Sequence, residues 1–263
     1  MTRLNELTKE LRIGSLEEFI DQVEYENKEQ YITDILELAV KKRRQRRIKR
    51  LIKQARFPMV KTLDGFDFTP VSFPESISRT ELLSLEFVDR KENLLELGSV
   101  GTGKTHLAIA LGLKACSQNR KVRFYRAVEL TNELLEKNKE SQAGRLMDQI
   151  SNVELLILDE MGYVPFSKKG AELLFSVISK SYEQQSIIIT SNLDFGRWNE
   201  VFGDDRMTAA LIDRLIHHAH ILPFSGKSYR FKQAMSKKNG NQIDDASGCR
   251  RGETRSKKNS NSK

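Results

Sequence analysis

The sequence predicts an α/β protein in which helices cover both faces of a parallel β-sheet. Short apolar runs alternate with helical stretches, a glycine-rich loop follows the first run, and two adjacent acids end the third. The predicted strands are 93–97, 121–127, 153–160, 186–192 and 218–224. The predicted helices between them are 104–118, 129–150, 169–184 and 205–217. This alternation indicates a parallel sheet, because parallel neighbours need long crossover connections, which are usually helical.

The chain divides into three predicted parts. Residues 1–56 are expected to form a small helical N-terminal domain that binds DNA or a partner, because apolar residues recur at helical spacing and Phe57-Pro58 ends the pattern. Residues 57–235 form the α/β domain. Residues 236–263 are expected to be a disordered basic tail, since they contain almost no large apolar groups.

The net charge of +8 is unevenly distributed. Residues 1–40 hold 4 Lys and Arg against 10 Asp and Glu, whereas 41–53 hold 9 against none. Nine cations without an acid repel one another unless an anion lies nearby. The basic segment 41–53 therefore favours nucleic acid binding, and pairing with the acidic 1–40 region of the same or a neighbouring chain is the alternative.

Composition argues against a membrane or secreted protein. No apolar run approaches the roughly 20 residues that a membrane span requires. The acidic first 30 residues do not resemble a secretory signal, and the two cysteines, Cys116 and Cys249, give no disulfide pattern. We expect a cytoplasmic protein with no membrane partner.

The stretch GSVGTGKT at 98–105 fits the pattern G-x-x-x-x-G-K-[ST] between a strand and a helix. Glycines allow backbone N–H groups to surround a phosphate, the lysine reaches the β and γ oxygens, and the threonine ligates Mg²⁺. The sequence thus predicts ATP and Mg²⁺ as cofactors. The predicted nucleotide-binding residues are Gly98, Ser99, Val100, Gly101, Thr102, Gly103, Lys104, Thr105 and His106.

Two further strand ends supply candidate catalytic residues. Asp159 and Glu160 follow the apolar run of LLILDE, so both are expected at the carboxyl edge of the sheet. Asp159, with Thr105, would hold Mg²⁺, and Glu160 would polarise the attacking water. Asn192, at the end of SIIITSN, would hydrogen-bond the water or the γ-phosphate. Lys104 completes the catalytic set within this chain.

Together these motifs resemble a known family. GSVGTGKTHLAIALGLKAC, LLILDEMGYVP, IIITSN and AALIDRLIHHAHILPFSGKSYRF, with QARFPMVKTLDGFDF upstream, resemble the IstB-like ATP-binding proteins. These are AAA+ ATPases that assist transposases of bacterial insertion sequences, and the DnaC and DnaI helicase loaders are more distantly similar. The resemblance covers roughly 30–235. It implies a P-loop AAA+ three-layer sandwich with a five-stranded parallel sheet.

The resemblance also implies an arginine finger. Arg214 in LIDRL lies where such ATPases carry the arginine that reaches the γ-phosphate of a neighbouring subunit, so hydrolysis would require an oligomer. The alternative for Arg214 is an ion pair with Asp213 or Asp205, and Arg206 is a weaker candidate finger. The predicted helix 129–150 would line a DNA channel, with its basic side chains as phosphate contacts or as ordinary solvated charges.

The function implied is an ATP-dependent transposition helper. It would oligomerise on duplex DNA as a ring or filament, select or remodel the target, recruit or activate the cognate transposase, and disassemble on ATP hydrolysis. The alternative is a replicative helicase loader of the DnaC/DnaI type. A P-loop kinase would need an arginine-bearing lid and an acceptor pocket, which are not visible, and a non-hydrolysing scaffold would not need Glu160.

Some polar residues are not assigned to this function. His217, His218 and His220 are expected to pack structurally rather than bind zinc, because no matched carboxylate or cysteine is apparent beside them. Glu96 lies inside the strand that leads to the phosphate loop. A buried carboxylate there must find a cation, be protonated, or lie near the exposed end of the strand.

Overall fold

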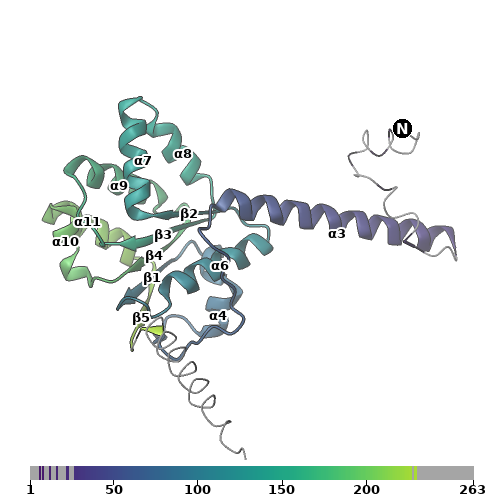
Figure 1. Ribbon diagram of the computed structural model, residues 1–263, viewed down its shortest axis with the longest axis horizontal. Coiled ribbons are helices and arrows are strands. Elements are labelled where there is room, and N and C mark those ends of the chain that lie inside the picture. Colours follow the sequence, from purple (N-terminus) through teal and green to yellow (C-terminus); the bar gives the residue numbers. More distant parts are fainter. Residues whose placement is uncertain are drawn as a thin grey trace, which may run out of the picture.

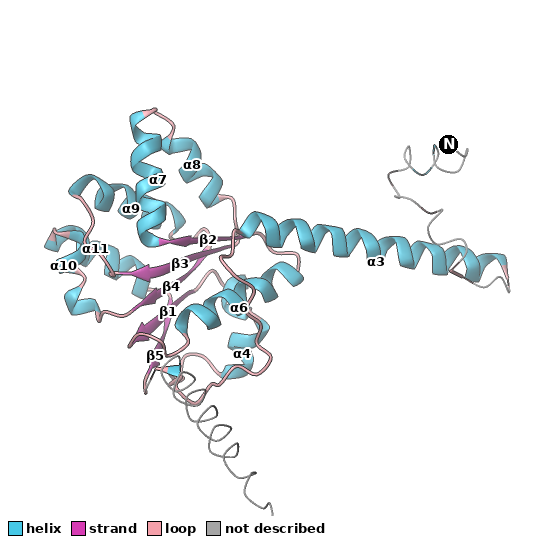
Figure 2. Ribbon diagram, in the orientation of Figure 1, coloured by secondary structure: helices cyan, strands magenta, loops and turns pink. Residues whose placement is uncertain are grey.

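The computed structural model describes residues 27–226 together with residues 6, 8, 12, 16, 22, 23, 228 and 229. Five parallel strands form one sheet in the order β2-β3-β4-β1-β5 (Figures 1 and 2). The strands are β1 Asn93–Gly98, β2 Val122–Arg126, β3 Leu155–Met161, β4 Ser186–Ser191 and β5 Ala219–Phe224. All five predicted strands are confirmed. The predicted tail at 236–263 and most of 1–26 lie outside the described residues.

Helices cover both faces of the sheet, as the sequence predicted (Figure 2). One face packs against a core that includes α6 and α4 and the end of α3, and the other against a core that includes α7, α8, α9, α10 and α11. These helices are α3 Lys28–Ala55, α4 Arg79–Ser84, α5 Glu86–Asp89, α6 Lys104–Ser117, α7 Ala127–Lys139, α8 Ala143–Ser151, α9 Lys168–Ser181, α10 Asn199–Phe202 and α11 Asp205–Ile216. A 3₁₀ turn, η1, spans Phe195–Arg197. The result is the predicted three-layer arrangement.

The long helix α3 extends away from the body of the protein (Figure 1). The Asn27 side chain caps its start by accepting from the Gln30 N–H at 2.8 Å, and left-handed Arg56 ends it just before Phe57-Pro58. Only its last turns join the main core, through Leu51 and Ala55. No helix in the described part of the chain is long and apolar enough to cross a membrane.

The predicted single helix 129–150 is wrong: the segment forms two helices, α7 and α8. The break lies at 140–142, where Ser141 takes a left-handed conformation with φ of 56°. Local polar residues around the break, with no apolar side chain to hold a straight helix against the body, allow the chain to reverse. Lys137 at the break forms an ion pair with Glu140 at 2.8 Å, which favours a local structural role for that lysine.

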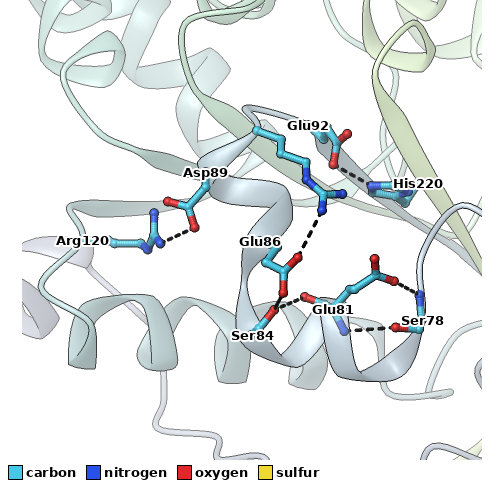
Figure 3. A network of polar contacts seen from close by, with 9 residues as sticks. Ser78, Glu81, Ser84, Glu86, Asp89, Glu92, Arg120 and His220 are labelled. Carbon is cyan, nitrogen blue, oxygen red and sulfur yellow. Dashed lines mark hydrogen bonds and ion pairs between the residues drawn. The ribbon is translucent and has the colours of Figure 1, made fainter.

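A network of polar contacts secures the segment before β1 (Figure 3). Ser78 and Glu81 form a capping box at the start of α4, and Arg120 reaches Asp89 at 2.9 Å. His220 of β5 contacts Glu92 through Nε2 at 2.9 Å and Ser76 through Nδ1 at 3.0 Å. The structural role expected for His220 is therefore confirmed.

Candidate active site

The glycine-rich loop joins β1 to α6 at the carboxyl edge of the sheet (Figure 1). Its three glycines, Gly98, Gly101 and Gly103, have φ values of 143°, 80° and 110°, which side chains rarely adopt. A Cβ at Gly98 would lie 2.0 Å from the Phe224 carbonyl oxygen, so the loop approaches β5 too closely for any other residue. Gly103 caps α6 without a side-chain hydrogen bond, which leaves the first N–H groups of the helix able to bind an anion.

Lys104 is buried, and its side chain is hydrogen-bonded to the phosphate loop. Its ammonium donates to the carbonyl oxygens of Gly98 at 2.6 Å and Ser99 at 2.8 Å. Thr102 donates to the Ser99 carbonyl at 2.8 Å, so the loop is braced internally. A lysine held inside a ring of backbone groups is positioned to meet phosphate oxygens without a large rearrangement.

The phosphate loop and the paired acids meet through hydrogen bonds. The Thr105 hydroxyl donates to Asp159 Oδ1 at 2.8 Å, and the Thr190 hydroxyl of β4 donates to the same oxygen at 2.6 Å. Asp159 is 2% exposed, so these hydroxyls satisfy a carboxylate that water scarcely reaches. The expected proximity of Thr105 and Asp159 is present, and Thr190 is a partner that sequence reasoning missed.

Glu160 points in the opposite direction from its neighbour. Its φ of 58° is left-handed, and the pairing of β3 with β4 shifts register between Leu158 and Met161. A bulge of this kind re-aims a side chain at the end of a strand. The Glu160 carboxylate is 51% exposed, and its N–H donates to Thr190 Oγ1 at 3.0 Å.

Arg126, at the end of β2, is a second residue that sequence reasoning missed. Its Nε lies 3.7 Å from Glu160 Oε2, and its Nη1 lies 3.2 Å from Glu129 Oε1. The sheet order makes this contact, because β2 and β3 are neighbours although about thirty residues separate them. The sequence showed that Arg126 is a charged residue at the end of a predicted strand, but it did not indicate that Glu160 is its partner.

Glu96 is fully buried, and neither carboxylate oxygen has a hydrogen-bond partner among the described residues. Burial raises the pKa of Glu96 well above its usual value, Asp159 raises it further, and Lys104 lowers it. The sequence left three possibilities for Glu96: a cationic partner, exposure at the end of the strand, or protonation. Glu96 has neither a bonded cation nor exposure, so the protonated form fits best. The raised pKa therefore favours the protonated form of this carboxyl group in the strand that leads into the phosphate loop.

The segment between α3 and α4 contacts the start of α6. His106 Nε2 lies 2.8 Å from the Thr62 carbonyl oxygen, and its ring packs edge-on to Phe66 at 5.1 Å. Phe66 also lies beside Gly103, 3.3 Å from where a Cβ would stand. His106, predicted as a nucleotide-binding residue, therefore has an aromatic neighbour at the mouth of the loop.

The two remaining predicted catalytic residues lie in different places. Asn192 is exposed and directly follows β4, beside the strand that carries Asp159 and Glu160. Arg214 lies near the amino edge: the carbonyl of its neighbour Leu215 accepts from Asn93 Nδ2, at the start of β1, at 3.1 Å. From Asn93 to Gly98 the strand runs about 17 Å. Arg214 is therefore remote from the phosphate loop of its own chain.

The surroundings of Arg214 differ from the predicted alternative of an ion pair. Its guanidinium donates to the Ala210 carbonyl at 3.1 Å and lies 5.0 Å from the centre of the Phe175 ring on α9. No ion pair with Asp205 or Asp213 is found in the described part of the chain. A partly buried cation on an aromatic ring is held in a defined direction. Arg206 is exposed on the first turn of the same helix.

The histidines separate into two groups, and the expectation that no carboxylate lies beside them is wrong for one group. His220 is structural, as described above, but His217 and His218 lie beside a carboxylate that the sequence did not indicate. Glu183, His217 and His218 each offer a ligand atom within 4.8 Å of the others. The reason is tertiary: Glu183 follows α9, the histidines follow α11, and the two helices end at the same place.

Comparison with known proteins points to one family. The family model of the IstB-like ATP binding protein matches residues 2–237. An insertion sequence IS21 putative ATP-binding protein of Pseudomonas aeruginosa is 40% identical over 239 residues, covering 83% of this chain and 89% of that protein. The IS5376 putative ATP-binding protein of Geobacillus stearothermophilus is also 40% identical, covering 78% and 81%.

Solved structures show the same fold. A DnaI crystal structure superposes with a TM-score of 0.50 at 19% identity, covering 68% of this chain and 92% of that one. A replication initiator DnaA bound to AMPPCP and single-stranded DNA gives 0.50 at 23%, covering 69% and 55%. The chain belongs to the family of IstB-like ATP-binding proteins and is similar to putative ATP-binding proteins of insertion sequences.

Proposed function

We propose that this chain hydrolyses Mg·ATP to control its assembly on duplex DNA as the helper of a transposase. ATP would close subunits into a ring or filament that selects or remodels target DNA and recruits or activates the transposase, and hydrolysis would release it. The observation that carries the enzymatic part is the connected set Thr105, Asp159, Thr190 and Glu160. Two hydroxyl contacts join the phosphate loop to Asp159 and to Thr190, and Thr190 accepts the backbone N–H of Glu160, whose carboxylate is exposed.

The donor set fits Mg²⁺. A threonine hydroxyl and a buried carboxylate oxygen lie 2.8 Å apart, and hard oxygen ligands together with substrate phosphates are what Mg²⁺ prefers. When bound, the ion would neutralise charge that develops on the β and γ phosphates. The chain's own part is to hold Thr105 and Asp159 in place, and Thr190 keeps the Asp159 carboxylate turned toward the loop.

Glu160 would take the proton of the attacking water. Its carboxylate is exposed at the sheet edge, whereas that of Asp159 is buried, so two adjacent acids serve different tasks. Asn192 follows the neighbouring strand and would orient the same water. Arg126 holds Glu160 in an ion pair at 3.7 Å and would act as a positioning residue that limits basal hydrolysis.

Arg214 would complete the site of an adjacent subunit. It lies near the start of β1, whereas its own phosphate loop follows the other end of that strand, which is about 17 Å long. Its guanidinium is held against the Phe175 ring of α9. Ala209, Ile212, Asp213, Ile216 and His217 line a shallow groove beside it of about 500 Å³. An arginine supplied from a neighbour makes hydrolysis depend on assembly.

The basic segment would contact DNA phosphates. Arg43, Arg46, Arg47, Arg50 and Lys121 line a cavity of about 670 Å³ where α3 meets the start of β2. Clustered arginines attract a polyanion, and each guanidinium group can bind two phosphate oxygens at once. We propose that residues 1–56 form the arm that binds DNA or a partner and 57–235 the ATPase domain.

The second candidate function is a helicase loader. It is favoured by the likeness in fold to DnaI, which extends over 92% of that chain. A loader would prefer single-stranded DNA and bind a replicative helicase, whereas the transposition helper would prefer duplex DNA. Filter binding with matched single- and double-stranded oligonucleotides in the presence of ATP separates the two.

Glu160→Gln tests the proposal. The amide keeps the shape of the side chain but cannot accept a proton, so kcat should fall by roughly 10² to 10⁴ while ATP binding is retained. The variant should accumulate as an ATP-bound oligomer on duplex DNA, visible by electron microscopy and by light scattering. Glu172→Gln, an exposed carboxylate on α9, is the matched control. Unchanged turnover in Glu160→Gln would reject the assigned chemistry.

A further inference from the structure

The amino edge of the sheet carries a cluster of side chains that ATP hydrolysis does not use. Tyr182 and Glu183 follow α9, and His217 and His218 connect α11 to β5. The ligand atoms of Glu183, His217 and His218 lie within 4.8 Å of one another, and all three residues are exposed. This set lies at the opposite edge of the sheet from the phosphate loop, which follows the far end of β1.

The geometry of the cluster is close to that of a metal site. His218 Nε2 lies 3.8 Å from Glu183 Oε1, and the two imidazole rings lie 4.2 Å apart at 70°. Bonds of about 2.0–2.2 Å to nitrogen and oxygen place donors roughly 3 to 3.5 Å apart around a tetrahedral ion. Small rotations of exposed side chains would bring the three donors to that separation.

Tyr182 supplies the outer contact that metal-binding histidines usually have. Its hydroxyl oxygen lies 2.9 Å from His217 Nδ1, which leaves Nε2 of that ring to face a cation. The Tyr182 hydroxyl therefore contacts one of the candidate ligand histidines from outside the cluster.

We propose that Glu183, His217 and His218 bind a divalent transition-metal cation of the Zn²⁺ type, with water at the open position. Two imidazole nitrogens and one carboxylate suit zinc and its neighbours in the first transition row and do not suit Mg²⁺ or Ca²⁺, which prefer oxygen. The site is distinct from the Mg·ATP site in both location and ligand chemistry.

A cation there would join the ends of two helices. Arg214 is one turn before His217 on α11 and packs on Phe175 of α9, and the cluster links the last residues of the same helices. Metal binding would therefore hold α9 and α11 in a fixed relative position, and with them the side chain of Arg214. The effect on Arg214 rests on the proposed function, in which Arg214 completes the site of a neighbouring subunit. The proposal that the cluster binds a metal does not depend on that role.

The test uses untagged, full-length protein and Zn²⁺ as the probe. Competition against a chromophoric zinc chelator should give one tight ion per chain, and X-ray absorption should show a first shell of nitrogen and oxygen with two imidazoles. The double variant His217→Ala/His218→Ala should lose at least tenfold in affinity, and Tyr182→Phe should lose less. His106→Gln, which removes a histidine at the other edge of the sheet, should bind as the wild type does.

Thermal unfolding gives a second readout that does not depend on ATP turnover. Zn²⁺ should raise the unfolding midpoint of the wild type and leave that of the double variant unchanged, because a ligand that binds only the folded state stabilises it. Circular dichroism of metal-free proteins establishes that the variant folds. Absence of a tight ion in the wild type, or equal binding by the double variant, would overturn the proposal. If Zn²⁺ binds but does not change the effect of Arg214→Ala on ATP turnover, the metal site is supported and only its proposed influence on Arg214 is rejected.

Discussion

At the scale of single residues, Thr190 contacts both acids at the end of β3. One hydroxyl donates to Asp159 at 2.6 Å and accepts the N–H of Glu160 at 3.0 Å. It therefore fixes a buried carboxylate and a left-handed backbone at the same time. The sequence showed only a polar residue in an apolar run, which is also what an ordinary strand end shows.

Thr190→Val should separate positioning from binding. Valine has nearly the same shape but no hydroxyl, so the N–H of Glu160 loses its partner, at a cost of about 1–3 kcal/mol in unfolding free energy. We expect a lower kcat with a nearly unchanged KM for ATP, measured by steady-state turnover, because Lys104 and the loop remain in place. Thr190→Ser should restore most of the activity. A change in KM alone would assign Thr190 to binding.

Glu96 makes the stability of the protein depend on pH. Its folded pKa is raised, so above its unfolded pKa of about 4.3 the folded state keeps a proton that the unfolded state releases. The unfolding free energy should then fall as pH rises toward the folded pKa, by about 1.4 kcal/mol per pH unit. The contribution is fully present below the unfolded pKa.

Glu96→Leu should remove this dependence. Urea unfolding at pH 5, 6, 7 and 8 should show the variant gaining on the wild type as pH increases. Glu96→Gln should also lack the slope, although its amide remains without a hydrogen-bond partner. Parallel curves for wild type and Glu96→Leu would mean that Glu96 stays ionised in the folded state.

At the scale of elements, α3 is the helix that would make the proposed DNA contacts. Only its last turns pack on the body, while its arginines surround the cavity next to Lys121. The helix pattern and its end at Phe57-Pro58 could be read from the sequence, since both depend on neighbouring residues. The cavity could not, because Lys121 comes from a different element.

Arg43→Ala/Arg47→Ala/Arg50→Ala should weaken duplex binding through lost phosphate contacts. If the wild type neutralises about six phosphates, a plot of log affinity against log salt concentration should have a slope near −5. The slope for the triple variant should be less steep by about 2 to 3. Fluorescence anisotropy across a salt series measures it. Lys91→Ala/Lys168→Ala/Lys169→Ala removes three exposed cations elsewhere and should keep the wild-type slope. Equal slopes in both variants would exclude α3 from DNA binding.

The break between α7 and α8 shows where element prediction fails. The composition of 129–150 favours a helix throughout, yet residues 140–142 reverse the chain and both halves pack on the same side of the sheet. Leu134 and Leu146 belong to one core. Burial of both helices against the body outweighs the local preference for continuing one helix.

At the scale of the whole molecule, the phosphate loop and Arg214 lie at opposite edges of one sheet. β1 connects the two edges, from the amide of Asn93 to the glycine that opens the loop. A single chain cannot bring the two together, whereas adjacent copies in a head-to-tail arrangement can. Turnover per molecule should therefore fall on dilution.

Mixing two inactive variants tests this arrangement. Arg214→Ala should lower kcat by about 10³ or more, and Lys104→Ala should abolish ATP binding. When the two are mixed, a Lys104→Ala subunit can lend its Arg214 to the intact loop of an Arg214→Ala neighbour. ATPase assays should then recover part of the activity. Arg206→Ala is the control on the same helix and should retain turnover; no recovery on mixing would place Arg214 outside the neighbour's site.

The sequence by itself determined the strands, the phosphate loop and the adjacent acids, because each is written in a few consecutive residues whose chemistry is local. Only the tertiary structure decided that Thr190 and Arg126 meet those acids, that Glu96 is buried without a partner, and that Glu183 joins His217 and His218. These contacts depend on the strand order β2-β3-β4-β1-β5 and on where helices end. Burial of the two cores sets that order through interactions between distant residues, which no local pattern records.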